Sequence, residues 1–98
     1  MQDAHTEEIE LALKEARQLM RYGATKAALD ELEVVRPWLC ASTTLGSEAL
    51  LEIGMAKIAA GDADGAKPVL VQVQARAPEA KVKNAAKQRL FQEEAISL

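Results

Sequence analysis

The sequence predicts an all-α domain, and three observations support this prediction. Residues 47–60 (SEALLEIGMAKIAA) are so apolar that, on a 3.6-residue helix, their apolar side chains cover most of the circumference. Segments with helical spacing of apolar residues precede and follow this stretch, so they can cover it on more than one side. The hydrophobic share of 49% is rich in alanine and includes only 3% aromatic residues, a mixture typical of close-packed helices. We therefore expect five helices, with residues 47–60 in the middle.

Composition limits the classes of protein to consider. A chain of 98 residues fits one domain with one core, and a net charge of -3 is too small to indicate a polyanion-binding protein. A single cysteine excludes an internal disulfide framework and favours a reducing compartment. The start of the chain, MQDAHTEEIE, lacks the pattern of a secretory signal, and no apolar run approaches the roughly 18 residues of a membrane span. We expect a soluble, cytoplasmic protein that does not enter membranes.

The first helical hairpin is predicted over residues 6–39. Thr6 and the acids after it start a helix over residues 6–22, and Gly23 ends that helix because glycine adopts positive φ without a steric clash. Thr25 caps a second helix, which Pro37 limits or kinks. The expected inward side chains are Ile9, Leu11, Ala12, Leu13, Ala16, Leu19 and Met20 in the first helix, and Ala27, Ala28, Leu29, Leu32 and Val35 in the second.

The second hairpin is predicted over residues 44–77, after a connector at residues 39–46. Its first helix ends at Gly61, and its second helix has Pro68 within about the first turn, where unpaired backbone N–H groups are normal. The valines of VLVQV leave a strand as the alternative for this last segment. The candidate capping residues are Thr43, Thr44 or Ser47 for the first helix, and Asp62 or Asp64 for the second.

A last helix is predicted over residues 78–96, with Pro78 at its first position. Its expected inward side chains are Ala80, Val82, Ala85, Ala86, Leu90 and Phe91. Its exposed face carries the basic residues Lys81, Lys83, Lys87 and Arg89. Such a cluster can contact phosphates, but a solvated face is the favoured reading because no second aromatic residue accompanies Phe91 for base stacking. We expect no nucleic-acid partner.

The two hairpins form an internal duplication. Gly23 and Gly61 lie 38 residues apart, and aligning them also pairs Ala28 with Ala66 and Leu32 with Leu70. This offset equals a unit of about 34 residues plus four that the connector can absorb.

At these residues the second unit resembles the tetratricopeptide repeat (TPR) family. The family pattern W-x2-L-G-x2-Y appears as Leu50-x2-Ile53-Gly54-x2-Lys57, and A-x3-F followed by P appears as Ala66-x3-Leu70 and Pro78. The departures are Leu50 for the tryptophan and Lys57 for the tyrosine. The first unit keeps Gly23, Ala28 and Leu32 but has Ala16 at the interior glycine and Leu19 at the tyrosine. The resemblance covers residues 6–96 and implies two degenerate repeats and a capping helix, arranged as an antiparallel array of helical hairpins (an α-α superhelix).

The same resemblance implies a concave groove lined by the first helix of each hairpin. Carried over to this chain, the partner-binding residues are Glu10, Leu13, Arg17, Met20, Glu48, Leu51, Glu52, Met55 and Ile58. Leu51, Met55 and Ile58 form an apolar stripe that either takes a partner segment or is covered by the last helix. The lysine and asparagine clamp of TPR proteins that bind chaperone tails is mostly missing, because the matching positions are Leu13, Arg17, Leu51, Met55, Ala85 and Arg89.

Residues that could support catalysis are sparse. His5 lies before the first helix, in a segment that we expect to be frayed, and Cys40 has no histidine placed to deprotonate it, so we read it as a small half-buried residue. Neither has the companions that a zinc site requires. We expect neither an enzyme nor a cofactor.

The favoured function is therefore a small scaffold or chaperone that holds an amphipathic segment of another protein. Acidic Glu10, Glu48 and Glu52 suggest basic flanks on that segment. In size and layout the chain resembles the small repeat chaperones of bacterial secretion systems. The alternative is a homo-oligomer in which exposed repeat ends stack on neighbouring copies.

Overall fold

The computed structural model describes residues 5–97, with side chains described for residues 5–92. The all-α prediction is confirmed, because these residues form α-helices, one short 3-10 helix and no strand. In chain order the elements are α1 (Thr6–Arg21), α2 (Thr25–Val35), η1 (Arg36–Trp38), α3 (Thr44–Ala59), α4 (Ala63–Arg76) and α5 (Ala80–Ser97). The strand alternative for VLVQV is excluded, since this segment lies inside α4.

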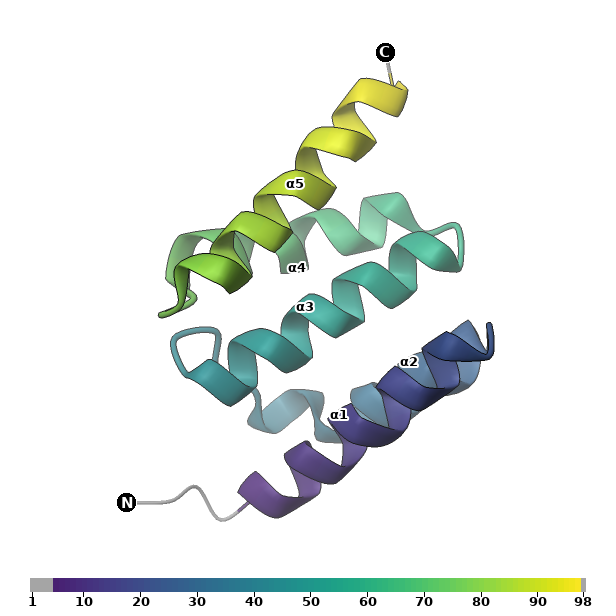
Figure 1. Ribbon diagram of the computed structural model, residues 1–98, viewed down its shortest axis with the longest axis vertical. Coiled ribbons are helices and arrows are strands. Elements are labelled where there is room, and N and C mark those ends of the chain that lie inside the picture. The colour runs from purple at the N-terminus through teal and green to yellow at the C-terminus, as the bar shows by residue number, and fades with distance from the viewer. Residues whose placement is uncertain (1–4, 98) are drawn as a thin grey trace.

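The helices form two layers (Figure 1). One layer contains α1, α3 and α5, and the other contains α2 and α4 behind them. The helices α1 and α2 pair as one antiparallel hairpin, α3 and α4 pair as a second, and α5 packs on the second hairpin. As predicted, α3 is the central element, since it packs against each of the four other α-helices.

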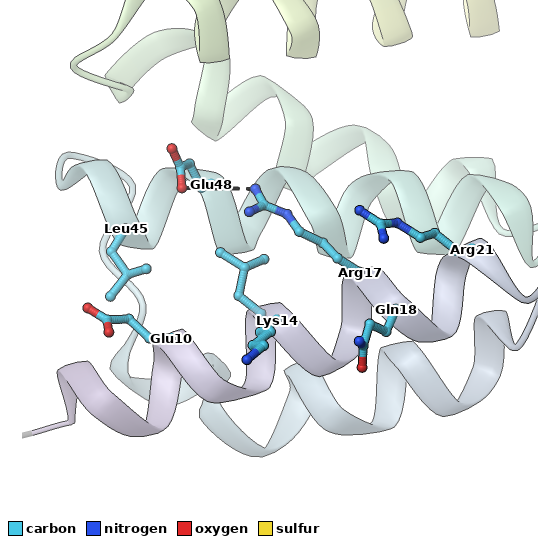
Figure 2. Close-up of a pocket in the computed structure, with 8 residues that line it drawn as sticks. Glu10, Lys14, Arg17, Gln18, Arg21, Leu45 and Glu48 are labelled. Atoms are coloured by element: carbon cyan, nitrogen blue, oxygen red, sulfur yellow. Dashed lines mark ion pairs between the residues drawn. The ribbon is translucent and has the colours of Figure 1, made fainter.

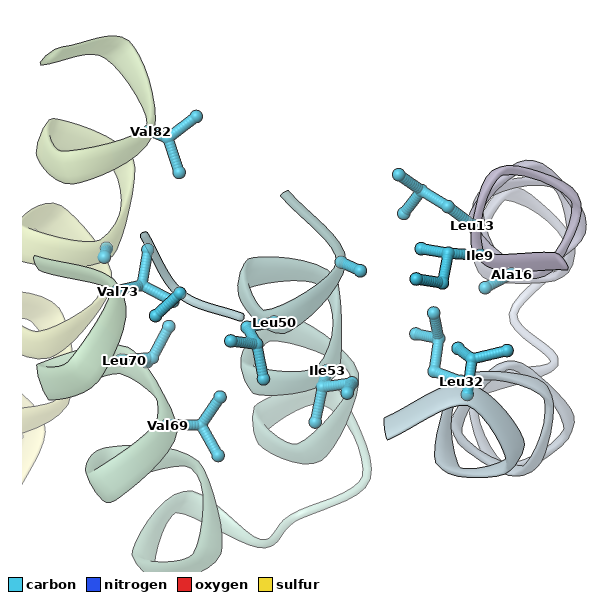
Figure 3. Close-up of a cluster of buried hydrophobic side chains, with 14 of the residues drawn as sticks. Ile9, Leu13, Ala16, Leu32, Leu50, Ile53, Val69, Leu70, Val73 and Val82 are labelled. Carbon is cyan, nitrogen blue, oxygen red and sulfur yellow. The ribbon is translucent and has the colours of Figure 1, made fainter. Parts of the chain in front are cut away.

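The core of the molecule surrounds α3. Figure 3 shows Leu50 and Ile53 of α3 between side chains of the first hairpin on one side and side chains of α4 on the other. Residues around most of this helix are buried, including two that are polar: Gly46, Ser47, Ala49, Leu50, Glu52, Ile53, Gly54 and Ala56. The prediction that this helix is covered on more than one side is therefore confirmed.

The two hairpin turns have the same backbone geometry. Gly23 has φ of 77° and Gly61 has φ of 88°, values at which a Cβ atom would be strained. The amide of the residue after each glycine donates to a carbonyl five residues earlier, from Ala24 to Leu19 at 2.9 Å and from Asp62 to Lys57 at 2.8 Å. This pattern is a common way to end a helix on a glycine. The glycine stops predicted from the sequence are confirmed.

Two of the candidate caps are used. The Thr43 hydroxyl oxygen accepts from the Gly46 amide at 3.0 Å, and the Asp62 carboxylate accepts from the Gly65 amide at 2.9 Å. Each satisfies one of the amides that a helix start leaves without an intrahelical partner.

Pro68 and Pro78 lie at other positions relative to their helices than predicted. Pro68 is the sixth residue of α4, beyond the first turn, so it cannot donate to the carbonyl of Asp64. Both residues are exposed, which leaves that carbonyl near solvent and explains how the helix tolerates the proline. Pro78 precedes α5, which begins at Ala80 after the Glu79 carbonyl accepts the Lys83 amide at 3.1 Å.

Several apolar residues expected to point inward are exposed. Phe91 on α5 is 72% exposed, because the C-terminal part of this helix runs past α3 and α4 (Figure 1). Leu11 and Ala27 are exposed on the first hairpin, and Ala80 is exposed at the start of α5. Helical periodicity placed these residues next to core positions, but no described helix covers them.

The close contact between α3 and α4 predicts the effect of enlarging Gly54. A Cβ atom at Gly54 would lie 2.6 Å from Cδ2 and 2.8 Å from Cγ of Leu70, a fully buried side chain. We expect Gly54→Ala to lower the free energy of unfolding by about 1–3 kcal/mol through overpacking, and Gly54→Leu by more. Urea denaturation measures this loss. Leu70→Ala removes the obstructing atoms, so the double variant should be more stable than the sum of the two single losses predicts. Strict additivity would contradict the proposed contact.

A pair of carboxylates connects α1 and α2. A hydrogen bond with Glu15, together with the negative charge of that residue, raises the pKa of Glu31. A carboxyl group whose pKa is raised by folding stabilises the fold while it is protonated, and this contribution is lost as the pH rises through the raised pKa. Above the raised pKa of Glu31, the negative charges of the pair therefore oppose folding.

We expect Glu31→Gln to raise the melting temperature at pH 7, because it removes this repulsion and keeps a hydrogen-bonding group. The gain should shrink as the pH falls through the raised pKa of Glu31, because the wild-type carboxyl then becomes protonated. Glu33→Gln is the matched control on the same helix, since Glu33 lies 3.4 Å from the Arg36 guanidinium and should give no gain. Thermal melts followed by circular dichroism from pH 3 to 8 measure this gain. A gain that does not change with pH would contradict the pairing of Glu31 with Glu15.

Candidate partner-binding groove

The layer that contains α1, α3 and α5 has two adjacent depressions on its outer surface, which together we call the groove. The first depression, about 420 Å³, lies between α1 and α3 (Figure 2). The second depression, about 430 Å³, lies among α1, α3 and α5. The first is lined by Glu10, Leu13, Lys14, Arg17, Gln18, Arg21, Leu45 and Glu48, and the second by Met20, Arg21, Glu52, Met55, Ile58, Ala59 and Arg89.

The structure brings together most of the groove residues predicted from the sequence. Glu10, Leu13, Arg17 and Glu48 line the first depression, and Met20, Glu52, Met55 and Ile58 line the second. Leu51 lines neither depression, because it is half-buried and packs against the core. Leu13 is only 4% exposed, so it is a core residue that a ligand touches at most by its edge. The role of these residues in binding stays a prediction.

An arginine of α1 pairs with two acids of α3 in the groove. Nε of Arg17 lies 3.3 Å from Oε1 of Glu52, and Nη2 of Arg17 lies 3.9 Å from Oε2 of Glu48. Glu48 and Glu52 are one helical turn apart, so a single guanidinium on α1 reaches both. The Glu52 side chain is only 11% exposed, which makes an ionic partner important for it. Two of the three acids that the sequence expected to face a basic segment thus already have a cation of the chain beside them, and the basic flanks stay a prediction.

Three cations also line the groove. Lys14 lies in the first depression, Arg89 in the second, and Arg21 borders both. None of the three forms an ion pair with a side chain that the structure describes. Sequence reasoning left Lys14 and Arg21 out of the groove, although Arg21 follows Arg17 by one helical turn. It placed Arg89 on a solvated face, because only the packing of α5 brings this residue to the groove.

The fifth helix borders the groove without filling it. Arg89 of α5 contributes to the wall of the second depression, while Met55 and Ile58 of α3 remain part of its lining. The apolar stripe was expected either to take a partner segment or to be covered by the last helix. The described part of α5 does not cover the end of the stripe that Met55 and Ile58 form.

The remaining candidates for chemistry lie apart from the groove. His5 is half-buried, with its ring stacked on Trp38 at 3.7 Å and 4°, so it is not the exposed residue of a frayed end that the sequence predicted. Cys40 is exposed, not half-buried, and a hydrogen bond with the Ser42 hydroxyl at 2.9 Å lowers the pKa of its thiol. No basic side chain is placed within hydrogen-bond reach of this thiol among the described residues.

In the part of the chain that the structure describes, no group of three or more His, Cys, Asp or Glu side chains is placed to hold a metal ion. None of the described helices combines the length and the apolar character that crossing a membrane requires.

Comparison of the chain with protein-family models, with curated proteins and with solved structures finds no match. The role of the groove is therefore argued from its own geometry.

We expect Arg17→Met to lower the free energy of unfolding at pH 7 by about 1 kcal/mol, because it leaves Glu48 and Glu52 next to each other without a cation. Urea denaturation measures the loss, and the double variant Arg17→Met/Glu52→Gln should recover part of it. Arg36→Met is the matched control, since Arg36 forms an exposed pair with Glu33, three residues earlier in the chain, and its loss should cost less. Equal losses in the two arginine variants would contradict the role assigned to Arg17.

Proposed function

We propose that this protein is a non-catalytic protein–protein interaction module, a small TPR-like scaffold or chaperone that holds a helical or extended segment of a partner protein in the groove. The observation that carries the proposal is the strip of α3 left uncovered. This helix is otherwise enclosed by its neighbours, yet Met55 and Ile58 line an open depression. Exposed apolar lining at the centre of a fold is a common feature of peptide-binding surfaces.

The arrangement of the helices supports the resemblance to TPR proteins. Two hairpins follow one another with the same glycine turn, and a further helix packs on the second hairpin. Gly54 and Leu70, two positions of the family pattern, lie against each other between α3 and α4. We also propose a cytoplasmic location, which is consistent with an exposed free thiol at Cys40.

Self-assembly is the second candidate, and exposed apolar side chains favour it. Val34 on the first hairpin is 69% exposed, and Phe91 on α5 is 72% exposed. These residues lie on the first hairpin and on the last helix of the array, so the end of one copy could stack on the end of another. Light scattering over a range of concentrations tests this candidate, and a mass that stays at one chain would exclude it.

The groove proposal predicts different outcomes for two neighbouring residues of α3. Met55→Glu places a charge in the open depression, so we expect it to reduce retention of the partner by about tenfold or more while the melting temperature changes little. Leu51→Glu places a charge against the core, so we expect it to destabilise the fold by about 1–3 kcal/mol. Quantitative pull-down from native extract measures retention, and thermal melts measure stability.

The control variant is Gln72→Glu, which adds the same charge at an exposed position of α4 in the other layer. It should change neither retention nor stability. If Met55→Glu unfolds the domain, or retains the partner as well as Gln72→Glu does, the groove is not the binding surface.

A further inference from the structure

From the charges along the groove we infer that its partner is an amphipathic protein segment with acidic side chains on both sides of its apolar stripe. This inference rests on the proposed function, and it reverses the basic flanks expected from the sequence. It follows from which charged groups in the groove already have partners and which do not.

The acids of the groove are partly offset within the chain. Glu48 and Glu52 share the single guanidinium of Arg17, which offsets one of their two negative charges, and the Glu52 side chain is only 11% exposed to a ligand. Glu10 is the remaining acid of the lining, and Lys14 follows it by one helical turn on the same helix, where opposite charges attract. A basic segment therefore finds little negative charge to bind.

Two cations that have no ion-pair partner among the described side chains border the apolar surface. Met20, Met55 and Ile58 provide the apolar part of the second depression, Arg21 borders it from α1, and Arg89 borders it from α5. A segment that places an apolar side chain between them therefore has a guanidinium on each side. Guanidinium groups bind carboxylates through two parallel hydrogen bonds, so glutamate or aspartate at these flanks is the complementary choice.

The arrangement also excludes the opposite charge. A lysine or arginine at either flank would meet Arg21 or Arg89 as a like charge beside an apolar surface, where water screens the repulsion less than in bulk. Discrimination by charge is a common way for an interface to reject wrong partners.

The experiment is a selection from a displayed library of helical peptides. Each peptide has apolar residues at i, i+3, i+4 and i+7, and Glu, Lys or Gln in equal amounts at the flanking positions. The peptides are fused at both ends, so no free terminal carboxylate is present. The full chain is the bait, and sequencing before and after selection gives the enrichment of Glu over Lys. With two exposed charge contacts we expect about tenfold enrichment of Glu over Lys.

Charge reversal in the groove should reverse this preference. With the variant Arg21→Glu/Arg89→Glu as bait, we expect Lys to be enriched over Glu. If this charge reversal unfolds the chain, the milder variant Arg21→Gln/Arg89→Gln replaces it and should show no preference between Lys and Glu. Lys81→Glu/Lys83→Glu is the control, because it changes the net charge equally at exposed positions that line neither depression. It should keep the preference for Glu. Thermal melts establish that each bait is folded.

The outcomes separate the two proposals. Peptides that are enriched on the wild-type chain and lost on Met55→Glu, but that show no preference for Glu, would overturn the acidic partner and leave the groove proposal standing. A preference for Glu that persists in the Arg21/Arg89 variants would overturn it as well. If no peptide is enriched above the background of Met55→Glu, the groove proposal and the inference both fail.

Discussion

The structure depends on the need to cover α3 on most of its sides. Such a helix cannot be stable in water with one neighbour, since each exposed side would leave apolar surface hydrated. Its four helical neighbours meet this need from two layers: α1 and α5 lie beside it, while α2 and α4 lie behind it. The positions of the two depressions follow from this packing, because both lie on the side of α3 that faces outward between its neighbours, where Met55 and Ile58 are only half-buried.

The same packing explains the electrostatics of the groove. Glu52 lies on the buried circumference of α3, at a place where a hydrophobic residue would otherwise be expected. Its charge is tolerated because α1 runs close enough for Arg17 to reach it at 3.3 Å. A buried carboxylate with one ionic partner adds little net stability, but loss of that partner is costly. Arg17 therefore supplies the counter-charge that Glu52 needs and contributes to the charge at the surface of the groove.

Local signals in the sequence predicted much of the fold. The positions of both turns, the caps Thr43 and Asp62, and the central place of α3 came from glycine conformation, side-chain hydrogen bonding and apolar periodicity. Periodicity failed at Leu11 and Phe91, because it shows which face of a helix is apolar but not whether another helix covers that face. The predicted position of Pro78 was wrong for a related reason, since proline is compatible both with the first position of a helix and with the turn before it.

The groove could be predicted only in outline. The resemblance to TPR proteins placed the groove on the first helix of each hairpin. Most of the residues chosen on that basis line the two depressions, because helical spacing gathers them on one side of each helix. The ion pair of Arg17 with Glu52 joins residues that are 35 apart in sequence. The stacking of His5 on Trp38 joins the two ends of the first hairpin. Such contacts depend on the tertiary packing and leave no signal in the spacing of residues. The partners of the groove acids could not be predicted for this reason.

The position of Arg17 has one more consequence. Its guanidinium lines the first depression, where it pairs with Glu48 (Figure 2), while its other partner, Glu52, lines the second depression, so the pair of Arg17 and Glu52 links the two depressions. A chain lying along the groove must therefore insert its side chains at two separate points and pass over a polar bridge between them. A shift of that chain by one residue would bring an apolar side chain onto the bridge, so the divided surface fixes the alignment of whatever it holds.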